Sequence, residues 1–249
     1  MQSDYGADTH RIVTLLLDRA GYRAGSEYGR IFRRYPEVRA TAKLLDAGCG
    51  TGFLAYSAHL ATGCKITLLD YSHTALARAA QVQRGLMQRG VVIQPAMVQG
   101  DLEHLPFRDA FDVVCNEGVI EHWLTDEGLS HVISQMVQAA RPGGLILIWI
   151  PNAHHRFYQP NERVPTENPP DAVRLRSLLE AAGLERVHIF GHRPYRSMFV
   201  YDHRIKRLEA LGVLLWFLER LLPEALRERL ALKYGYQLVG SGYKPGAAS

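Results

Sequence analysis

The chain has 249 residues, of which 47% are hydrophobic, so it is long enough for one α/β domain with additions and a substantial core. Its net charge of +4 comes without a dense run of Lys or Arg, which argues against a nucleic-acid-binding surface. Three cysteines without a C-x-x-C pair, no signal-peptide pattern and no apolar run of about 20 residues predict a cytoplasmic protein without an integral membrane segment.

Residues 1–42 are expected to form a helical cover that precedes a sheet. Apolar residues at helical spacing predict a helix over residues 9–20, with Gly21 as its stop. A second short helix is expected from Ser26, with Tyr28 on its apolar side. Two interpretations of these helices stay open, namely simple packing on the sheet and covering of a ligand site.

Residues 43–192 alternate strands with helices, which predicts an α/β fold with a doubly wound, mostly parallel sheet. Ser72 and Thr125 are expected to cap two of the helices, and Pro142-Gly143-Gly144 to make a turn before the fifth strand. Pro95 argues that the third strand is not central. The strands are expected at Lys43–Ala47, Ile66–Asp70, Ala96–Gln99, Phe111–Cys115, Leu145–Ile150, Glu185–Phe190 and Tyr236–Tyr243.

A long polar loop and a helical insertion follow the fifth and sixth strands. Residues 151–170 are polar and proline-rich, and a loop of that length is more often functional than idle. Residues 193–234 are expected to be an insertion before the last strand and tail, residues 235–249. Its helix Arg204–Leu222 is apolar on most sides, so we expect its second face to cover the substrate pocket or meet another subunit, with peripheral membrane contact as the alternative. Pro223 is expected to end this helix and open the next.

The stretch Leu44–Gly52, Leu-Leu-Asp-Ala-Gly-Cys-Gly-Thr-Gly, joins a buried strand to a helix, which is where open α/β sheets bind nucleotides. Its alternate glycines Gly48, Gly50 and Gly52 leave no side chain between the backbone and a ligand. The dinucleotide fingerprint needs glycine at the sixth position, where this chain has Phe53. The G-x-G-x-G pattern behind an acid resembles motif I of the class I S-adenosylmethionine-dependent methyltransferases. That resemblance implies a seven-stranded Rossmann-like sheet whose last strand is antiparallel.

The resemblance also implies S-adenosylmethionine as cofactor and S-adenosylhomocysteine as product. An acid about 20 residues beyond the glycine loop is placed to accept hydrogen bonds from ribose hydroxyls, and Asp70 has that place. In the family, the acid matching Asp101 binds the adenine amino group and the N–H matching Leu102 meets a ring nitrogen. Asp46 would orient the glycine loop and the methionine amino group. The other expected cofactor-site residues are Gly48, Cys49, Gly50, Gly52, Tyr71, Asn116 and Glu117.

The segment Cys115–Trp123 resembles the family segment whose start touches the methionine moiety and whose Glu-His lies near the transferred methyl. Methyl transfer from a sulfonium mostly requires alignment of nucleophile, carbon and sulfur. A hydroxyl or acidic carbon must also lose a proton, and a histidine pKa of about 6.5 suits that task. His122 is therefore the candidate base, with Glu121 beside it; the alternative is a structural histidine at a helix start.

Three more residues are expected to line the substrate pocket: Tyr28, His154 and His155. Adjacent histidines suggest a metal, but no acidic or histidine partner stands at a short ligand spacing, so no metal site is expected. Cys49 lies at a helix N-terminus without a paired base, which argues against nucleophilic catalysis.

The function expected is methyl transfer to the oxygen, nitrogen or carbon of a small molecule, such as a quinone-like or natural-product compound. A homodimer stays open. Two other classes stay open as well: a nicotinamide-dependent oxidoreductase, which Phe53 disfavours, and a non-catalytic protein that keeps the fold as a binding module.

Overall fold

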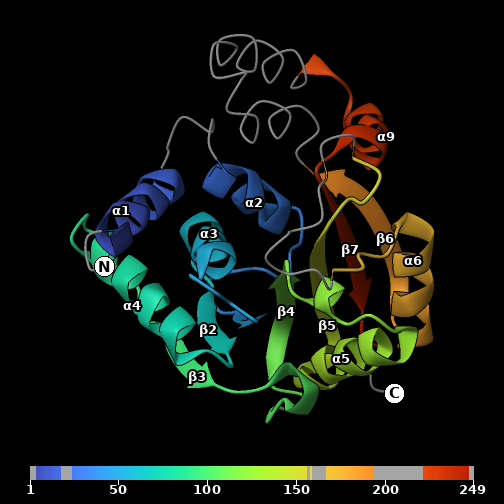
Figure 1. The fold of residues 1–249 in the computed structure, drawn as a ribbon, viewed down its shortest axis with the longest axis horizontal. Helices are drawn as coiled ribbons and strands as arrows, with labels where there is room; N and C mark the ends of the chain where they lie inside the picture. Colours follow the sequence, from blue (N-terminus) through green and yellow to red (C-terminus); the bar gives the residue numbers. More distant parts are fainter. Residues whose placement is uncertain (1–3, 18–23, 156–157, 159–166, 193–220, 247–249) are drawn as a thin grey trace. The chain divides into compact units, whose positions relative to one another are not determined.

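The structure, a computed structural model, describes residues 4–17, 24–155, 158, 167–192 and 221–246. Seven strands form one sheet in the order β3-β2-β1-β4-β5-β7-β6, as the doubly wound prediction requires (Figure 1). The strands are β1 (Lys43–Ala47), β2 (Lys65–Asp70), β3 (Ala96–Gln99), β4 (Phe111–Glu117), β5 (Ala140–Pro151), β6 (Glu185–His192) and β7 (Gln237–Tyr243). The described helices are α1 (Asp4–Leu16), α2 (Ala24–Arg33), α3 (Phe53–Thr62), α4 (His73–Met87), α5 (Asp126–Ala139), α6 (Ala172–Ala181) and α9 (Glu224–Tyr234), with 3-10 turns η1 (Leu102–His104) and η2 (Ile120–His122).

The chain divides into two compact units, each built from separate stretches of sequence. The first unit comprises Met1–Glu117, Ser134–Ile146 and Lys244–Ser249; the second comprises Gly118–Ile133 and Leu147–Tyr243. The first four strands therefore belong to the first unit, β6 and β7 belong to the second, and β5 is shared between them.

In the first unit, β1 pairs in parallel with β2 and β4, and β2 pairs in parallel with β3. The short strand β3 lies at the edge of the sheet, which agrees with the prediction from Pro95 that this strand is not central. α1 packs along α4, and α2 packs across α3 (Figure 1). Small residues allow the first of these contacts, because a Cβ on Gly85 would lie 2.7 Å from Val13 Cγ2. The two N-terminal helices therefore pack on α3, which follows the glycine loop, and on α4, which follows β2.

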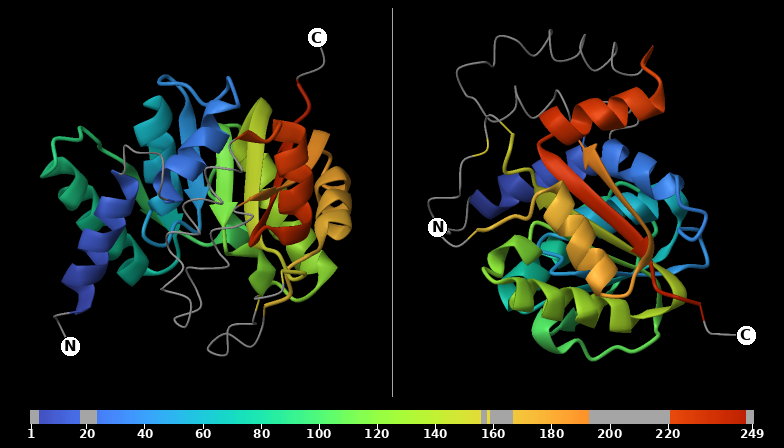
Figure 2. Two further views of the ribbon diagram at one scale, coloured as in Figure 1. Left: turned by 90° about the horizontal axis from the view of Figure 1, so that it is seen from above. Right: turned by 90° about the vertical axis from the view of Figure 1, so that its right-hand side faces the viewer.

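In the second unit, β7 runs antiparallel to β6, as predicted, with Ile189 opposite Gly240. α6 contacts both strands and α9 contacts β6; the right-hand view of Figure 2 shows α6 and α9 beside this pair. The backbone of α9 comes so close to Gly191 that a Cβ there would lie well inside 3.0 Å of Ala231 and Leu232 backbone atoms. Only glycine fits at that position.

Local capping predictions are confirmed. Ser72 Oγ accepts the Ala75 N–H at 3.3 Å, and Thr125 Oγ1 accepts the Gly128 N–H at 3.1 Å. α9 begins directly after Pro223, as expected. None of the helices in the described part of the chain combines the length and hydropathy needed to cross a bilayer.

Two boundary predictions are wrong. The helix expected over residues 9–20 begins at Asp4 and ends at Leu16. The turn expected at Pro142-Gly143-Gly144 is part of β5, because Gly143 N–H donates to Lys244 O at 3.0 Å and Lys244 N–H donates to Gly144 O at 2.9 Å. The positive φ of 73° at Gly143 is the local irregularity that its sequence signalled. The expected helix Arg204–Leu222 lies outside the described residues except for its last two.

Candidate functional site

The glycine loop between β1 and α3 holds its backbone in a conformation that favours glycine. Gly48, Gly50 and Gly52 have φ values of 83°, 52° and 75°. A Cβ on Gly52 would lie 2.7 Å from the Tyr56 ring, whereas a Cβ on Gly50 would meet nothing within 4 Å. Gly52 is thus required by packing, and Gly50 faces open space where a ligand can approach the backbone.

Asp70, at the end of β2, ties this loop to the next strand. One carboxylate oxygen accepts the Gly50 N–H at 2.9 Å, and the other accepts the Ser72 N–H at 2.9 Å. Each carboxylate oxygen has a second acceptor site, so Asp70 keeps capacity for ligand hydroxyls. Tyr71, the next residue, is 78% exposed, which is unusual for a tyrosine and leaves its ring available for stacking. The structure therefore brings Gly50, Asp70 and Tyr71 to one place.

Asp46, at the end of β1, is a buried carboxyl with a perturbed pKa. Its side chain is 1% exposed and accepts the Ala55 N–H at 3.2 Å. Burial raises the pKa of Asp46 to about 7, and the nearby charge of Asp70 adds to the rise. Burial likewise raises the pKa of the Cys49 thiol, which keeps it protonated and unreactive. Asp46 can therefore change its charge near neutral pH when a cation comes close.

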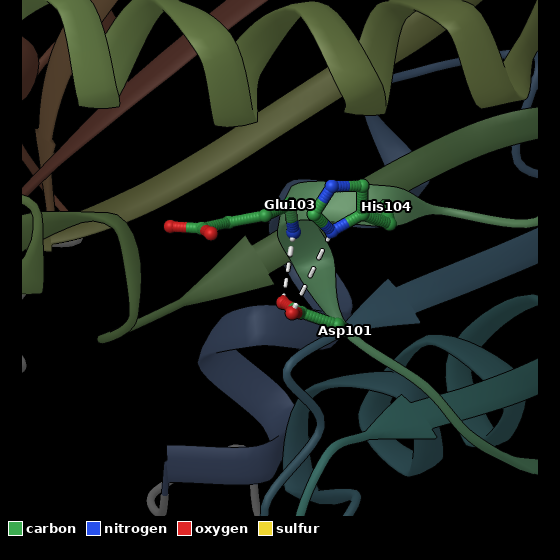
Figure 3. A group of neighbouring side chains, drawn as sticks. All are labelled: Asp101, Glu103 and His104. Carbon is green, nitrogen blue, oxygen red and sulfur yellow. Dashed lines mark hydrogen bonds and ion pairs between the residues drawn. The ribbon is translucent and has the colours of Figure 1, made fainter.

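Asp101 caps the 3-10 turn η1 that follows β3. One of its oxygens accepts the Glu103 N–H at 2.9 Å, and the His104 ring lies 3.8 Å from the other (Figure 3). The Asp101 side chain accepts the N–H of Glu103 and not that of Leu102. The Leu102 N–H therefore stays available to a ligand acceptor. Asp101, Glu103 and His104 also bring ligand atoms within 4.8 Å of one another, but exposed acidic groups of one turn are common without an ion, and we assign no metal site there.

At the end of β4, Asn116 presents an unsatisfied acceptor. The residue is fully buried, its Nδ2 donates to Ala47 O at 2.5 Å, and its Oδ1 has no hydrogen-bond partner in the described part of the chain. A buried acceptor without a donor costs free energy, on the order of 1–3 kcal/mol, unless a ligand supplies one. Together with the open space at Gly50, this atom fits a ligand that carries hydrogen-bond donors.

Tyr28 connects α2 to this end of β4. Its hydroxyl donates to a Glu117 oxygen, and its ring meets Phe53 edge-on with centroids 5.8 Å apart. The side chain is 1% exposed. The sequence predicts Tyr28 as a substrate-pocket residue, but it does not reveal the contact with Glu117, because the two residues are far apart in sequence. In the structure, Tyr28 fastens the N-terminal helix to the strand end that carries Asn116.

In the second unit, the segment after β4 forms a tight turn, η2, that carries Glu121 and His122. Gly118 opens it with a φ of 67° and donates its N–H to Trp149 O at 3.0 Å. Glu121 is 2% exposed, whereas the His122 side chain is exposed. The histidine is therefore the accessible member of the expected Glu-His pair.

The histidine pair after β5 is split by burial. His154 is exposed, and its N–H donates to Asn152 Oδ1 at 3.1 Å. His155 is buried, and its ring meets Tyr236 edge-on with centroids 5.6 Å apart. Sequence reasoning missed Asn152, which is buried and whose Nδ2 donates to Gly235 O at 2.9 Å. Its position directly after Pro151 at a strand end was the available signal.

Two more polar residues of this unit were also missed. The Tyr158 hydroxyl donates to Glu167 Oε2 at 3.1 Å. Partial burial, this bond and the negative charges of Glu167 and Glu121 raise the pKa of Tyr158 to about 12. The two described ends of the long loop therefore meet at this pair, within the electrostatic reach of Glu121.

The central part of the chain matches known proteins. Residues 45–148 match the family described as "Methyltransferase domain". Over 120 residues the chain is 34% identical to malonyl-[acyl-carrier protein] O-methyltransferase of Erwinia billingiae, covering 48% of this chain and 43% of that protein. Over 192 residues it is 29% identical to the ubiquinone/menaquinone biosynthesis C-methyltransferase of Idiomarina loihiensis, covering 64% of this chain and 74% of that protein. The chain thus spans less than half the length of the first of these relatives.

A solved structure supports the fold. Phosphoethanolamine N-methyltransferase 2 of Haemonchus contortus, in complex with phosphomonomethylethanolamine and S-adenosylhomocysteine, aligns with a TM-score of 0.61 at 19% identity. The alignment covers 88% of this chain and 52% of that chain.

Proposed function

We propose that this protein is a class I S-adenosylmethionine-dependent methyltransferase that transfers the methyl group of S-adenosylmethionine to a small nucleophilic molecule, because residues 45–148 match the family described as "Methyltransferase domain" and the relatives are named as methyltransferases. The observation that carries the proposal is the glycine loop, in which the backbone of Gly50 is open to a ligand while Asp70 holds its N–H. The oxidoreductase alternative lacks its third glycine, since Phe53 occupies that position.

We assign residues of the first unit to three parts of the cofactor: the ribose, the adenine and the methionine amino group. Asp70 would accept hydrogen bonds from the ribose hydroxyls, with Tyr71 beside the adenine. Asp101 would accept from the adenine amino group, and the Leu102 N–H would donate to a ring nitrogen. The methionine amino group is a donor and a cation, which suits the acceptor Oδ1 of Asn116 and the carboxyl of Asp46.

The chemistry assigned to the protein is alignment and proton removal. When bound, S-adenosylmethionine supplies a methyl group on a cationic sulfur that leaves as a neutral thioether. His122, exposed on its turn, would take the proton of the acceptor, and Glu121 is the buried acid beside it in sequence. Tyr28 would act by holding α2 at the strand end rather than by touching the acceptor.

The acceptor atom is the open part of this proposal. The relatives are named as O- and C-methyltransferases, and the structural neighbour as an N-methyltransferase. Radiolabelled S-adenosylmethionine with a panel of phenols, amines, carboxylic acids and 1,3-dicarbonyl compounds would settle which class accepts the methyl group. If wild-type protein binds the cofactor but transfers methyl to no member of the panel, the binding-module alternative is favoured.

Asp70→Ala should weaken S-adenosylhomocysteine binding by about 10- to 150-fold. Its charge-assisted hydrogen bonds to the ribose are worth on the order of 1.5–3 kcal/mol, and the Gly50 N–H also loses its acceptor. Titration calorimetry measures the change, with Asp109→Asn as the control, because Asp109 forms an ion pair with Lys244 at the surface. Equal affinities for wild type and Asp70→Ala, or binding of NAD by wild type, would contradict the assignment.

Asp46→Asn should stabilise the unliganded protein at about pH 8 and weaken cofactor binding. The folded pKa of about 7 exceeds an unfolded value of about 3.9, so the unfolded state loses this proton first and stability falls as pH rises between the two values. The full penalty, up to about 4 kcal/mol, is present above pH 7 and absent near pH 4. Thermal unfolding of wild type and Asp46→Asn at both pH values tests this. If the variant has a higher midpoint than wild type only at about pH 4, or the same midpoint at about pH 8, Asp46 is not a buried acid of raised pKa.

A further inference from the structure

One residue of the loop after β5 spans the turn that carries His122. Asn168 donates its backbone N–H to Glu121 O at 2.8 Å and its side-chain Nδ2 to Leu124 O at 3.1 Å. These two carbonyl oxygens lie on either side of His122 along the chain. We propose that Asn168 is a positioning residue that holds the turn of His122 in place; the inference rests on the proposed role of His122 as the base.

The turn benefits from such a tie because its own backbone hydrogen bonds are of the 3-10 type. His122 N–H donates to Val119 O and Trp123 N–H donates to Ile120 O, both at 3.1 Å. Bonds of this 3-10 type have poorer geometry than those of an α-helix. An exposed histidine on a short 3-10 turn keeps its place only if the backbone beneath it is fixed.

Further contacts fix the two ends of the segment. At the start, Gly118 N–H donates to Trp149 O. At the end, Thr125 caps α5 through Gly128, and a Cβ on Gly128 would lie 3.0 Å from the Trp123 ring. Asn168 adds two hydrogen bonds to the segment between these ends, at Glu121 O and Leu124 O.

The sequence around Asn168 favours this geometry. Pro169 follows it, and a residue before proline is confined to extended backbone, which limits how Asn168 can move. Neither Pro169 nor Pro170 has an N–H, so Asn168 is the last backbone donor before the Asp171 cap of α6. The neighbouring Glu167 holds the Tyr158 hydroxyl, so the same loop end is tied to both Tyr158 and the turn. A displacement of this loop end would therefore also displace the turn that carries His122.

Hydrogen exchange of the complex with S-adenosylhomocysteine tests the contact without an acceptor. In Asn168→Ala, the His122 and Trp123 amides should exchange about fivefold to tenfold faster than in wild type, since a hydrogen bond to the turn is lost. Asn168→Asp should speed exchange as Asn168→Ala does, because the aspartate side chain has the size of asparagine but places a carboxylate acceptor against Leu124 O. Ser241→Ala is the matched control, because it removes a side-chain hydrogen bond to a backbone carbonyl of the same unit, that of His188, away from the turn. Unchanged exchange in both Asn168 variants overturns the inference.

A double-mutant cycle separates positioning from general stability. With the acceptor of highest turnover from the panel, Asn168→Ala should lower kcat about tenfold or more while KM for S-adenosylmethionine stays within about twofold. His122→Ala with Asn168→Ala should be no slower than His122→Ala alone, because Asn168 acts only through His122. Additive losses overturn the inference and leave the proposed function intact. If wild-type protein methylates nothing, or His122→Ala has wild-type activity, the role of the base fails and the inference fails with it.

Discussion

Replacement of His122 by alanine should lower the turnover of a protonated phenol by about 10²–10⁴-fold at neutral pH, with little change in cofactor affinity. This is the usual loss when a general base is removed. His122 is exposed on η2, where an acceptor can reach its ring, while the expected cofactor residues belong to other elements.

The acidity of the acceptor provides the sharper measurement. A nitrophenol that is already ionised at about pH 8 has no proton to give up, so His122→Ala should slow it far less than it slows unsubstituted phenol. His131→Ala on α5 is the matched control, since it removes another exposed histidine. An equal loss for both phenols would assign His122 to acceptor binding, and no loss for either would leave it a structural residue.

Replacement of Gly191 by alanine should destabilise the second unit by on the order of 3 kcal/mol or more. A Cβ at this position would overlap the backbone of Ala231 and Leu232, and backbone cannot turn aside as a flexible side chain can. α9 would have to move away from β6, which also takes Leu232 O and Gly235 O from Asn152 Nδ2. For a chain of this size the midpoint of thermal unfolding should fall by about 10 °C.

Gly246→Ala is the matched control for this measurement, because a Cβ there would meet nothing within 4 Å. If the Gly191 and Gly246 variants unfold at the same temperature, α9 does not pack on β6 as closely as the structure has it. If Gly191→Ala unfolds at a lower temperature, as expected, calorimetry with S-adenosylhomocysteine on its folded fraction shows whether cofactor binding is lost as well.

The features predicted correctly from sequence are those decided by neighbouring residues. Ser72 and Thr125 cap helices through N–H groups three residues ahead, and such bonds depend on local chemistry alone. β1 and β3 were predicted with their observed bounds, because apolar runs flanked by Gly or Pro signal strands directly. The glycine loop was recognisable because its conformation demands glycine.

The features that sequence reasoning missed depend on distant partners. Gly143 looked like a turn residue, but its pairing partner Lys244 is about 100 residues away and decides that the segment is a strand. Tyr28 faces Glu117, and Asn168 faces Leu124, without any spacing rule that relates them. Each of these contacts exists only after the sheet has brought separate segments together.

Lys244 also affects the order in which the protein can fold during its synthesis. Its backbone pairs with Gly143 and Gly144, and its Nζ donates to Asp109 at 2.6 Å and to Ala140 O at 2.8 Å. A ribosome releases these partners long before Lys244, at about 5–20 residues per second. For several seconds the nascent chain therefore carries an unpaired strand edge at Gly143–Gly144, of the kind that chaperones bind and that other chains can pair with. The first unit is completed only when the chain has emerged as far as Lys244.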